Sequence, residues 1–126
     1  MTSNNNNNNN HDDCIFCKII NKTIPSKLIY EDELIMAFYD LYPKSKVHFL
    51  IIPKRHIESM LMLNNNISQD LNIDKHNEDL QLMGYMVMQA NQIAKNILNL
   101  SGYKLHVNTG KTGGQEVFHL HIHILA

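Results

Sequence analysis

The chain has 126 residues, which is enough for one domain with a single hydrophobic core. It has 11 basic and 12 acidic residues, so its formal net charge of −1 gives no electrostatic reason to expect a nucleic acid or an anionic membrane as partner. No apolar run approaches the roughly 18 residues of a transmembrane helix, so we expect no integral membrane protein.

The N-terminal segment is polar and of low complexity. Residues 1–12 include the run Asn4 to Asn10 and cannot bury apolar surface, so we predict a disordered tail before a domain over residues 13–126. The segment has neither the basic stretch nor the apolar core of a signal peptide. We therefore expect a cytoplasmic protein, or one that is also nuclear.

The first half of the domain is predicted to contain one helix and three strands. Cys17–Lys22 is typical of a short helix, which ends before Pro25 because proline disfavours helical backbone in the residue before it. Three runs of apolar, β-branched and aromatic residues predict strands at Leu28–Tyr30, Leu34–Tyr39 and Val47–Ile52. The Asn-rich stretch Asn64–Asn77 is predicted to be a surface loop.

The second half begins with a change of period. Apolar residues recur at helical spacing from Asp79 to Leu100, and Gly102 follows as a stop signal, which predicts a long amphipathic helix. Strands are predicted at Tyr103–Asn108 and Glu116–Leu125, joined by the glycine-containing loop Thr109–Gln115. The predicted fold class is α+β, with an antiparallel sheet, one long helix and a short N-terminal helix.

The last strand contains three histidines at alternate positions. The period of two places His119, His121 and His123 on one face and three aliphatic residues on the other. Such a row of imidazoles indicates either a tris-imidazole metal site or a nucleophilic histidine whose neighbours fix its tautomer. The preceding loop has three glycines, which let backbone amides approach an anion such as phosphate closely.

Cys14 and Cys17 are the only cysteines, at a spacing common in zinc sites. A closed zinc site needs two more ligands, so two free buried thiols and a redox pair remain as alternatives.

The motifs together resemble the histidine triad family over nearly the whole chain after the tail. His119-Leu-His121-Ile-His123-Ile-Leu matches the family signature His-φ-His-φ-His-φ-φ. The stretches from Asp13 to Ile20, from Ala37 to Asp40 and from His48 to His56 are similar to the branch of nucleotide-binding proteins that act as nucleoside phosphoramidases. The resemblance implies a homodimer whose sheets become continuous, pairing the long helices and the strands at Tyr103–Asn108.

The resemblance also implies how such a protein reacts with a purine nucleotide or nucleoside phosphoramidate. His121 would be the nucleophile that forms a nucleotidyl-histidine, with His119, His123 and His48 as the other catalytic residues. His123 would bind phosphate oxygen, and His48 would orient the nucleophile. The positions that match the nucleotide contacts of the family are Ile15, Phe16, Ile19, Phe38, Asp40, Leu41, Asn108, Gly114, Gln115, Glu116, Val117, His121 and His123.

Related proteins with the N-terminal cysteine pair hold a structural zinc, and the resemblance implies Cys14, Cys17, His56 and His119 as its ligands.

Glu116 stands where many eukaryotic members have serine, and the sequence ends at Ala126 without the C-terminal extension of the phosphoramidase branch. Two other functions therefore stay open. One is the hydrolysis of dinucleoside polyphosphates or adenylyl sulfate, and the other is nucleotide-dependent interaction with incidental catalysis. His11, His76 and His106 receive no role beyond surface or strand residues.

Overall fold

The computed structural model describes residues 13–64 and 77–126. The predicted tail, residues 1–12, and most of the predicted loop at Asn64–Asn77 lie outside this range. In chain order the elements are α2 (Ile15–Ile20), β1 (Leu28–Glu31), β2 (Ile35–Tyr39), β3 (His48–Pro53), the 3-10 helix η1 (Met60–Met62), α3 (Glu78–Gln92), the π-helical turn η2 (Ile93–Ile97), β4 (Lys104–His106) and β5 (Ile122–Leu125).

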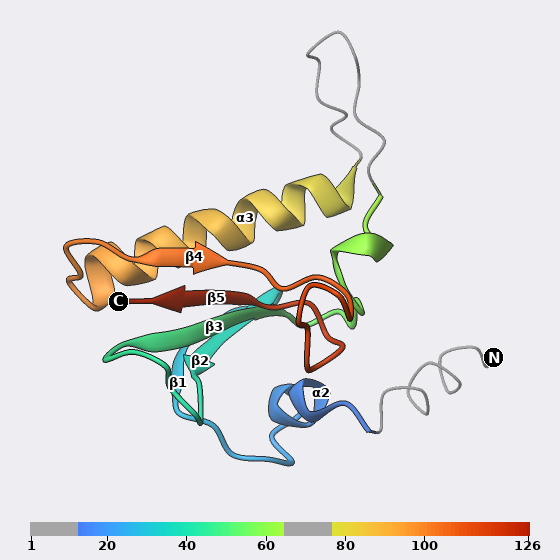
Figure 1. The fold of residues 1–126 in the computed structure, drawn as a ribbon, viewed down its shortest axis with the longest axis horizontal. Helices are drawn as coiled ribbons and strands as arrows, with labels where there is room; N and C mark the ends of the chain where they lie inside the picture. The colour runs from blue at the N-terminus through green and yellow to red at the C-terminus, as the bar shows by residue number, and fades with distance from the viewer. Residues whose placement is uncertain (1–12, 65–76) are drawn as a thin grey trace, which may run out of the picture.

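The five strands form one sheet in the order β1-β2-β3-β5-β4, and every neighbouring pair is antiparallel (Figure 1). All six residues of the central strand β3 are buried. The predicted α+β class with an antiparallel sheet is confirmed. Among the described helices, none is both long and apolar enough to cross a bilayer.

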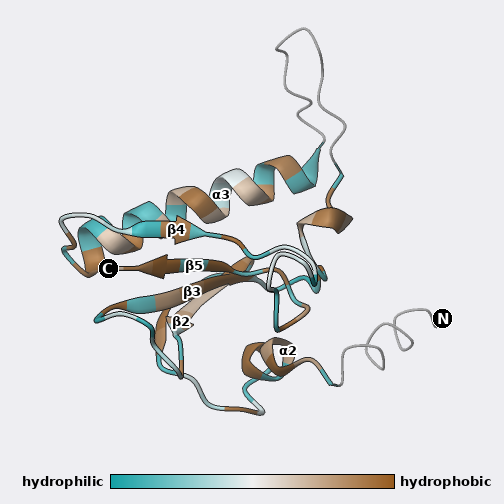
Figure 2. Cartoon of the chain, in the orientation of Figure 1, coloured by the Kyte–Doolittle hydropathy of each residue, from teal (hydrophilic) through white to brown (hydrophobic). Residues whose placement is uncertain are grey.

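The sheet separates two layers of side chains. α3 covers one face, where Phe49, Ile51 and Ile122 pack against Met86 and Ala90 of the helix (Figure 1). α2 lies at the opposite face, where a second apolar cluster contains its residues Phe16 and Ile19. Figure 2 shows that α2 is mostly apolar, that apolar and polar residues alternate along α3, and that apolar residues predominate in the strands. Because side chains alternate along a strand, His48 and Leu50 of β3 face the α2 side.

The predicted bounds of both helices, α2 and α3, need correction. α2 starts two residues before the predicted start, because the Cys14 Sγ accepts a hydrogen bond from the backbone N–H of Cys17 at 3.2 Å and caps the helix. α3 starts after Asn77, whose side chain caps it. The predicted stop at Gly102 is wrong: the turn η2 ends at Ile97, and Asn99, with φ of 54°, takes the left-handed conformation after the C-cap.

The predicted last strand is shorter than expected. β5 begins at Ile122, and the residues from Glu116 to His121 have no regular ladder. The backbone N–H of Leu120 instead donates to the carbonyl of Ile57 at 2.6 Å, which draws this segment toward the loop after β3. His119 and His121 therefore precede the strand, and the prediction of three imidazoles on one strand face is wrong for them. β4 is also shorter than the predicted Tyr103–Asn108.

Candidate functional site

A cavity of about 610 Å³ opens on the α2 side of the sheet. This volume is within the range of small-molecule binding sites. Its apolar part includes Phe16, whose ring meets Phe38 and His121 edge-on, with centroids 5.7 Å and 5.1 Å away. Twelve of the predicted nucleotide contacts line it: Ile15, Phe16, Ile19, Phe38, Asp40, Leu41, Asn108, Gly114, Glu116, Val117, His121 and His123.

Gln115 is the one predicted nucleotide contact that does not line the cavity. Its side chain is buried and already has three hydrogen bonds inside the protein. The oxygen accepts from the backbone N–H of Gly110 at 2.9 Å, and the nitrogen donates to the carbonyls of Glu58 and Val117. Gln115 therefore shapes the glycine loop and does not point into the site.

The glycine loop forms one end of the cavity. A Cβ at Gly113 would lie 2.3 Å from the carbonyl oxygen of Thr109, so only glycine fits there without a shift of the backbone. Gly114 has a φ of 83°, in the left-handed region that glycine adopts readily. The side chain of Asn108 donates to the carbonyl of Gly113 at 2.9 Å and holds the turn closed. These contacts explain why the loop needs glycines at these positions.

His121 is buried at the floor of the cavity, with one ring nitrogen fixed by the main chain. Its Nδ1 lies 2.7 Å from the carbonyl oxygen of His119. A carbonyl oxygen only accepts, so Nδ1 carries the proton and Nε2 of the neutral ring keeps its lone pair. Burial lowers the pKa of His121 below its usual value, although the bond to the His119 carbonyl acts in the opposite direction. The ring is therefore a neutral base with a free Nε2 at neutral pH.

His48 and His123 are joined to each other. The backbone N–H of Lys44 donates to Nδ1 of His48 at 3.1 Å, so the proton of neutral His48 sits on Nε2. That Nε2 lies 3.0 Å from Nδ1 of His123, which consequently accepts, and 3.5 Å from a carboxylate oxygen of Asp40. His123 therefore carries its own proton on Nε2. His48 supports His123 through this bond, whereas the sequence predicted that it orients the nucleophile.

Burial is the main reason that both of these histidines stay neutral. It lowers the pKa of His48, partly opposed by the charge of Asp40. For His123, burial and then the neighbouring imidazoles His121, His106 and His48 lower the pKa to about 4.

Asp40, His48 and His123 also lie close enough together to suggest a metal site. The hydrogen bonds argue against one. A cation on Nε2 of His48 would force the ring proton onto Nδ1, where the N–H of Lys44 already points at it. Two donors would then face each other, so this trio suits hydrogen bonding better than metal binding.

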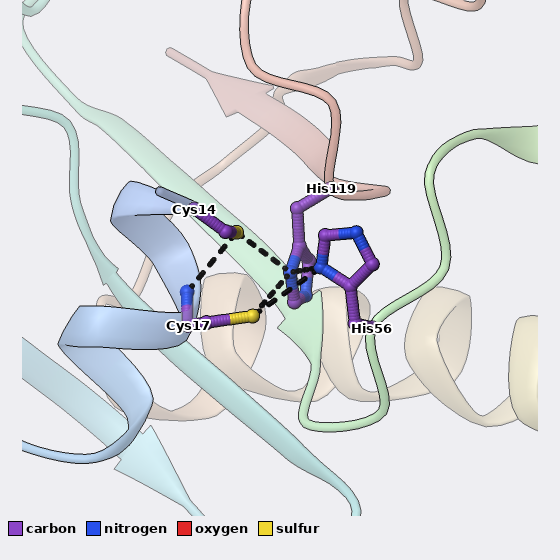
Figure 3. Close-up of side chains that lie close together, drawn as sticks. All are labelled: Cys14, Cys17, His56 and His119. Carbon is purple, nitrogen blue, oxygen red and sulfur yellow. Dashed lines mark hydrogen bonds between the residues drawn. The ribbon is translucent and has the colours of Figure 1, made fainter. Parts of the chain in front are cut away.

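A second cluster lies beside the cavity, where Cys14, Cys17, His56 and His119 converge (Figure 3). The cysteines come from the start of α2, His56 from the loop after β3 and His119 from the segment before β5. The Nδ1 atom of His119 is 3.4 Å from the Cys14 sulfur and 3.6 Å from the Cys17 sulfur, and Nδ1 of His56 is 3.3 Å from the Cys17 sulfur. The two Nδ1 atoms are 3.2 Å apart.

These spacings fit a tetrahedral zinc site with two sulfur and two nitrogen ligands. Zinc–ligand distances of about 2.3 Å to sulfur and 2.0–2.1 Å to nitrogen place neighbouring ligand atoms about 3.3–3.7 Å apart. The Nε2 of His119 donates to the carbonyl of Pro53 at 2.8 Å, which leaves the Nδ1 lone pair toward the cluster. Burial, with the neighbouring Cys14, raises the pKa of the Cys17 thiol to about 12, so a thiolate there requires a positive charge beside it.

His119 was predicted both as a catalytic residue and as a metal ligand. Its ring is fully buried, does not line the cavity and points at the two cysteines (Figure 3). The geometry favours the ligand role for the ring, while the backbone carbonyl of His119 accepts the hydrogen bond from Nδ1 of His121.

The sequence analysis missed several residues that line the cavity. His106 is the most important of them, because its ring stacks on His123 with centroids 4.6 Å apart. The signal was the position of His106 on the strand beside the histidine row. The other residues missed are Pro25, Ser26, Tyr39, Tyr42, Lys44, Leu50 and Leu125.

Comparisons with known proteins agree with this arrangement. A family model described as the HIT domain matches residues 21–126. The chain is 42% identical over 114 residues to Protein HitA of Neisseria gonorrhoeae, covering 90% of this chain and 95% of that protein. A HIT family hydrolase from Legionella pneumophila superposes with a TM-score of 0.77 at 36% identity, covering 90% of this chain and 92% of that one. A histidine triad protein from Clostridium difficile has a TM-score of 0.77 at 38% identity, with coverages of 91% and 90%.

Proposed function

We propose a function from the premise that this chain belongs to the HIT (histidine triad) domain family, whose model matches residues 21–126. The protein is a nucleotide-binding hydrolase that cleaves the P–N bond of purine nucleoside 5′-phosphoramidates, with His121 as the nucleophile. The observation behind this proposal is the bond from Nδ1 of His121 to the His119 carbonyl, which leaves Nε2 free in a neutral ring.

The reaction proceeds in two displacements at one phosphorus. Nε2 of His121 donates its lone pair to the α-phosphorus, a P–N bond to the ring forms, and the bond to the substrate amine breaks as that amine takes up a proton. Water then attacks the same phosphorus, the bond to the imidazole breaks, and the proton that the water loses to solvent balances the one that the amine took from solvent, which yields the nucleoside monophosphate. The intermediate is cationic at the ring because Nδ1 keeps its proton, which makes the imidazole a good leaving group in the second step.

The other residues of the cavity bind and position the nucleotide. The apolar wall formed by Ile15, Phe16, Ile19 and Phe38 suits a nucleobase. Asp40 accepts one bond from the N–H of Tyr42 at 2.8 Å and has further acceptor capacity for ribose hydroxyls. The Nε2–H of His123 is a donor for a phosphate oxygen, where charge builds up in the transition state.

We also propose that Cys14, Cys17, His56 and His119 hold a structural zinc ion. The support is the donor set and its spacing, together with the Pro53 carbonyl behind His119. All four positions of a tetrahedral ion are then filled by protein, so such an ion stabilises the fold and takes no substrate. The proposed ion links α2, which contributes to the apolar wall, with the loop after β3 and with the segment before β5.

A trapping experiment tests the nucleophile. The protein is mixed with adenosine 5′-phosphoramidate labelled at phosphorus, quenched within milliseconds to seconds, and examined for bound label. We expect acid-labile, base-stable label on the wild type and none on His121→Ala. His123→Ala is the matched control, because it should still form the label but more slowly, roughly a hundredfold or more if its proton assists the transition state.

Two outcomes would contradict the mechanism. Label that persists on His121→Ala would assign the nucleophile to another residue, and turnover by the wild type without any label would exclude a covalent intermediate. The same preparation should be assayed with diadenosine polyphosphate and adenylyl sulfate. A larger kcat/KM for either would replace the phosphoramidate as the substrate class while keeping His121 as nucleophile.

A further inference from the structure

His106 is a fourth imidazole at the cavity, and the mechanism above gives it no role. It is the last residue of β4, and the antiparallel ladder pairs it with His123 of β5. Directly opposite residues in such a ladder share a face of the sheet, so both side chains lie on the cavity side. Their rings are 4.6 Å apart between centroids, with planes only 21° from parallel.

The stack matters because the one hydrogen bond from His48 does not by itself fix the plane of the His123 ring. The terminal torsion of a histidine side chain has a broad energy minimum, so contacts with neighbours decide how the ring turns. His123 must keep Nδ1 on the Nε2–H of His48, at 3.0 Å, to keep its own proton on Nε2. The His48 ring is 5.2 Å away at 40° and the His121 ring 4.9 Å away at 60°, so His106 provides the only near-parallel ring contact to His123 among the described residues.

We propose that His106 is a positioning residue, whose ring holds the His123 imidazole in the orientation and tautomer that present its Nε2–H to a bound phosphate. The role of the phosphate rests on the proposed function. The arrangement of the two rings is a property of the protein alone, so it can be tested with or without turnover.

His106 also affects the charge of its neighbour. A positive charge on His106 disfavours one on His123, and it adds to burial and to His121 in lowering the pKa of His123. The other charged or titratable groups that face His123 are His48 from β3 and Asp40 from the loop after β2, and Asp40 acts in the opposite direction. Removal of the His106 imidazole should therefore raise the pKa of His123.

Three variants separate stacking from charge. His106→Phe keeps a flat ring that can stack but has no titratable group, and His106→Ala removes both. Glu33→Ala is the control, because Glu33 is exposed in the turn before β2, away from both His106 and the β4 edge, and does not line the cavity. Each protein is labelled with ¹⁵N in its histidine rings, and NMR spectra report the tautomer and the pKa of His123. kcat and KM are measured on the same samples.

The Ala variant should lose the single His123 tautomer and lower kcat roughly tenfold to a hundredfold, with a smaller change in KM, because a misplaced donor acts mainly in the transition state. The Phe variant should restore the tautomer and most of kcat, yet share the raised His123 pKa. Glu33→Ala should match the wild type. A His106→Ala protein with the wild-type His123 tautomer would overturn the proposal, and so would a Phe variant no better than Ala. If the wild type turns over no phosphoramidate, the proposed substrate fails, while the NMR result still decides the role of His106.

Discussion

His121 and His123 are two residues apart, yet hydrogen bonds fix their ring protons on opposite nitrogens. His121 donates from Nδ1 to a carbonyl and keeps a lone pair on Nε2, whereas His123 accepts at Nδ1 and keeps a proton on Nε2. One ring is thus suited to attack phosphorus and the other to donate to its oxygens. Residue types and spacing alone do not determine these tautomers, because the deciding partners are the carbonyl of His119 and the backbone N–H of Lys44.

The lowered pKa of His123 predicts how stability depends on pH. In the unfolded chain this histidine takes up a proton near its usual pKa of about 6.5, and in the folded protein only near 4. The unfolded state therefore binds more protons between these values, so the free energy of unfolding should fall as the pH is lowered through this window.

Urea unfolding at a series of pH values tests this expectation. His123→Gln should show a shallower loss of unfolding free energy between pH of about 6.5 and about 4 than the wild type. Effects of acid on the carboxylates or on a bound metal are common to both proteins and cancel in the comparison. Identical slopes would show that His123 takes up its proton equally well in the folded state.

At the scale of elements, the strands and the long helix were predictable and the segment before β5 was not. Runs of apolar residues identified β2 and β3, which are buried on both faces, and helical periodicity identified α3, which buries one side against the core. The stretch from Phe118 to Leu125 alternates in sequence like a strand, but the irregular part is set by contacts distant in the chain. Leu120 bonds to Ile57, and His119 bonds to Pro53. The cluster of Cys14, Cys17, His56 and His119 was predictable as a set only through a family resemblance, since its members lie up to 105 positions apart in the sequence.

The cluster of Cys14, Cys17, His56 and His119 joins three segments, so loss of the proposed zinc ion should loosen them together. Elemental analysis should find about one zinc ion per chain in the purified wild type, and less than about a tenth in Cys17→Ser. The Cys17→Ser protein should melt roughly 10 °C lower, because a structural metal contributes several kcal/mol to folding.

His106→Phe is a suitable control for this measurement, because it removes an imidazole outside the cluster and should keep its zinc. The structural ion would be excluded if the purified wild type contained no zinc and its melting temperature stayed the same after treatment with a chelator.

At the scale of the whole molecule, apolar side chains are exposed on the long helix, on the turn that follows it and just before an edge strand. β4 is an edge strand of the described sheet. Val87 and Met88 of α3 and Ile97 of η2 are at least 40% exposed, and Tyr103 precedes β4. An unpaired strand edge beside such a surface is typical of an interface. We propose that two copies pair here, extending the sheet from one protomer to the other as the sequence analysis expected.

Sedimentation velocity tests the pairing. The wild type should sediment as a dimer at micromolar concentration, and Met88→Asp as a monomer, because a buried carboxylate without a partner costs several kcal/mol at an interface. Leu34→Asp is the matched control, since Leu34 is also apolar and more than half exposed but lies just before β2, which two strands separate from β4 in the sheet. A monomeric wild type, or a Met88→Asp variant that remains dimeric, would place the interface elsewhere or remove it.

The hydrogen bond between His121 and the carbonyl of His119 limits how this protein can be redesigned. Every amino acid at position 119 supplies the same backbone carbonyl. A substitution there therefore alters the cluster of Cys14, Cys17, His56 and His119 without removing the oxygen that fixes the tautomer of His121. Changes in reactivity are therefore expected from substitutions of the side chains around His121, among them His48, His106 and His123.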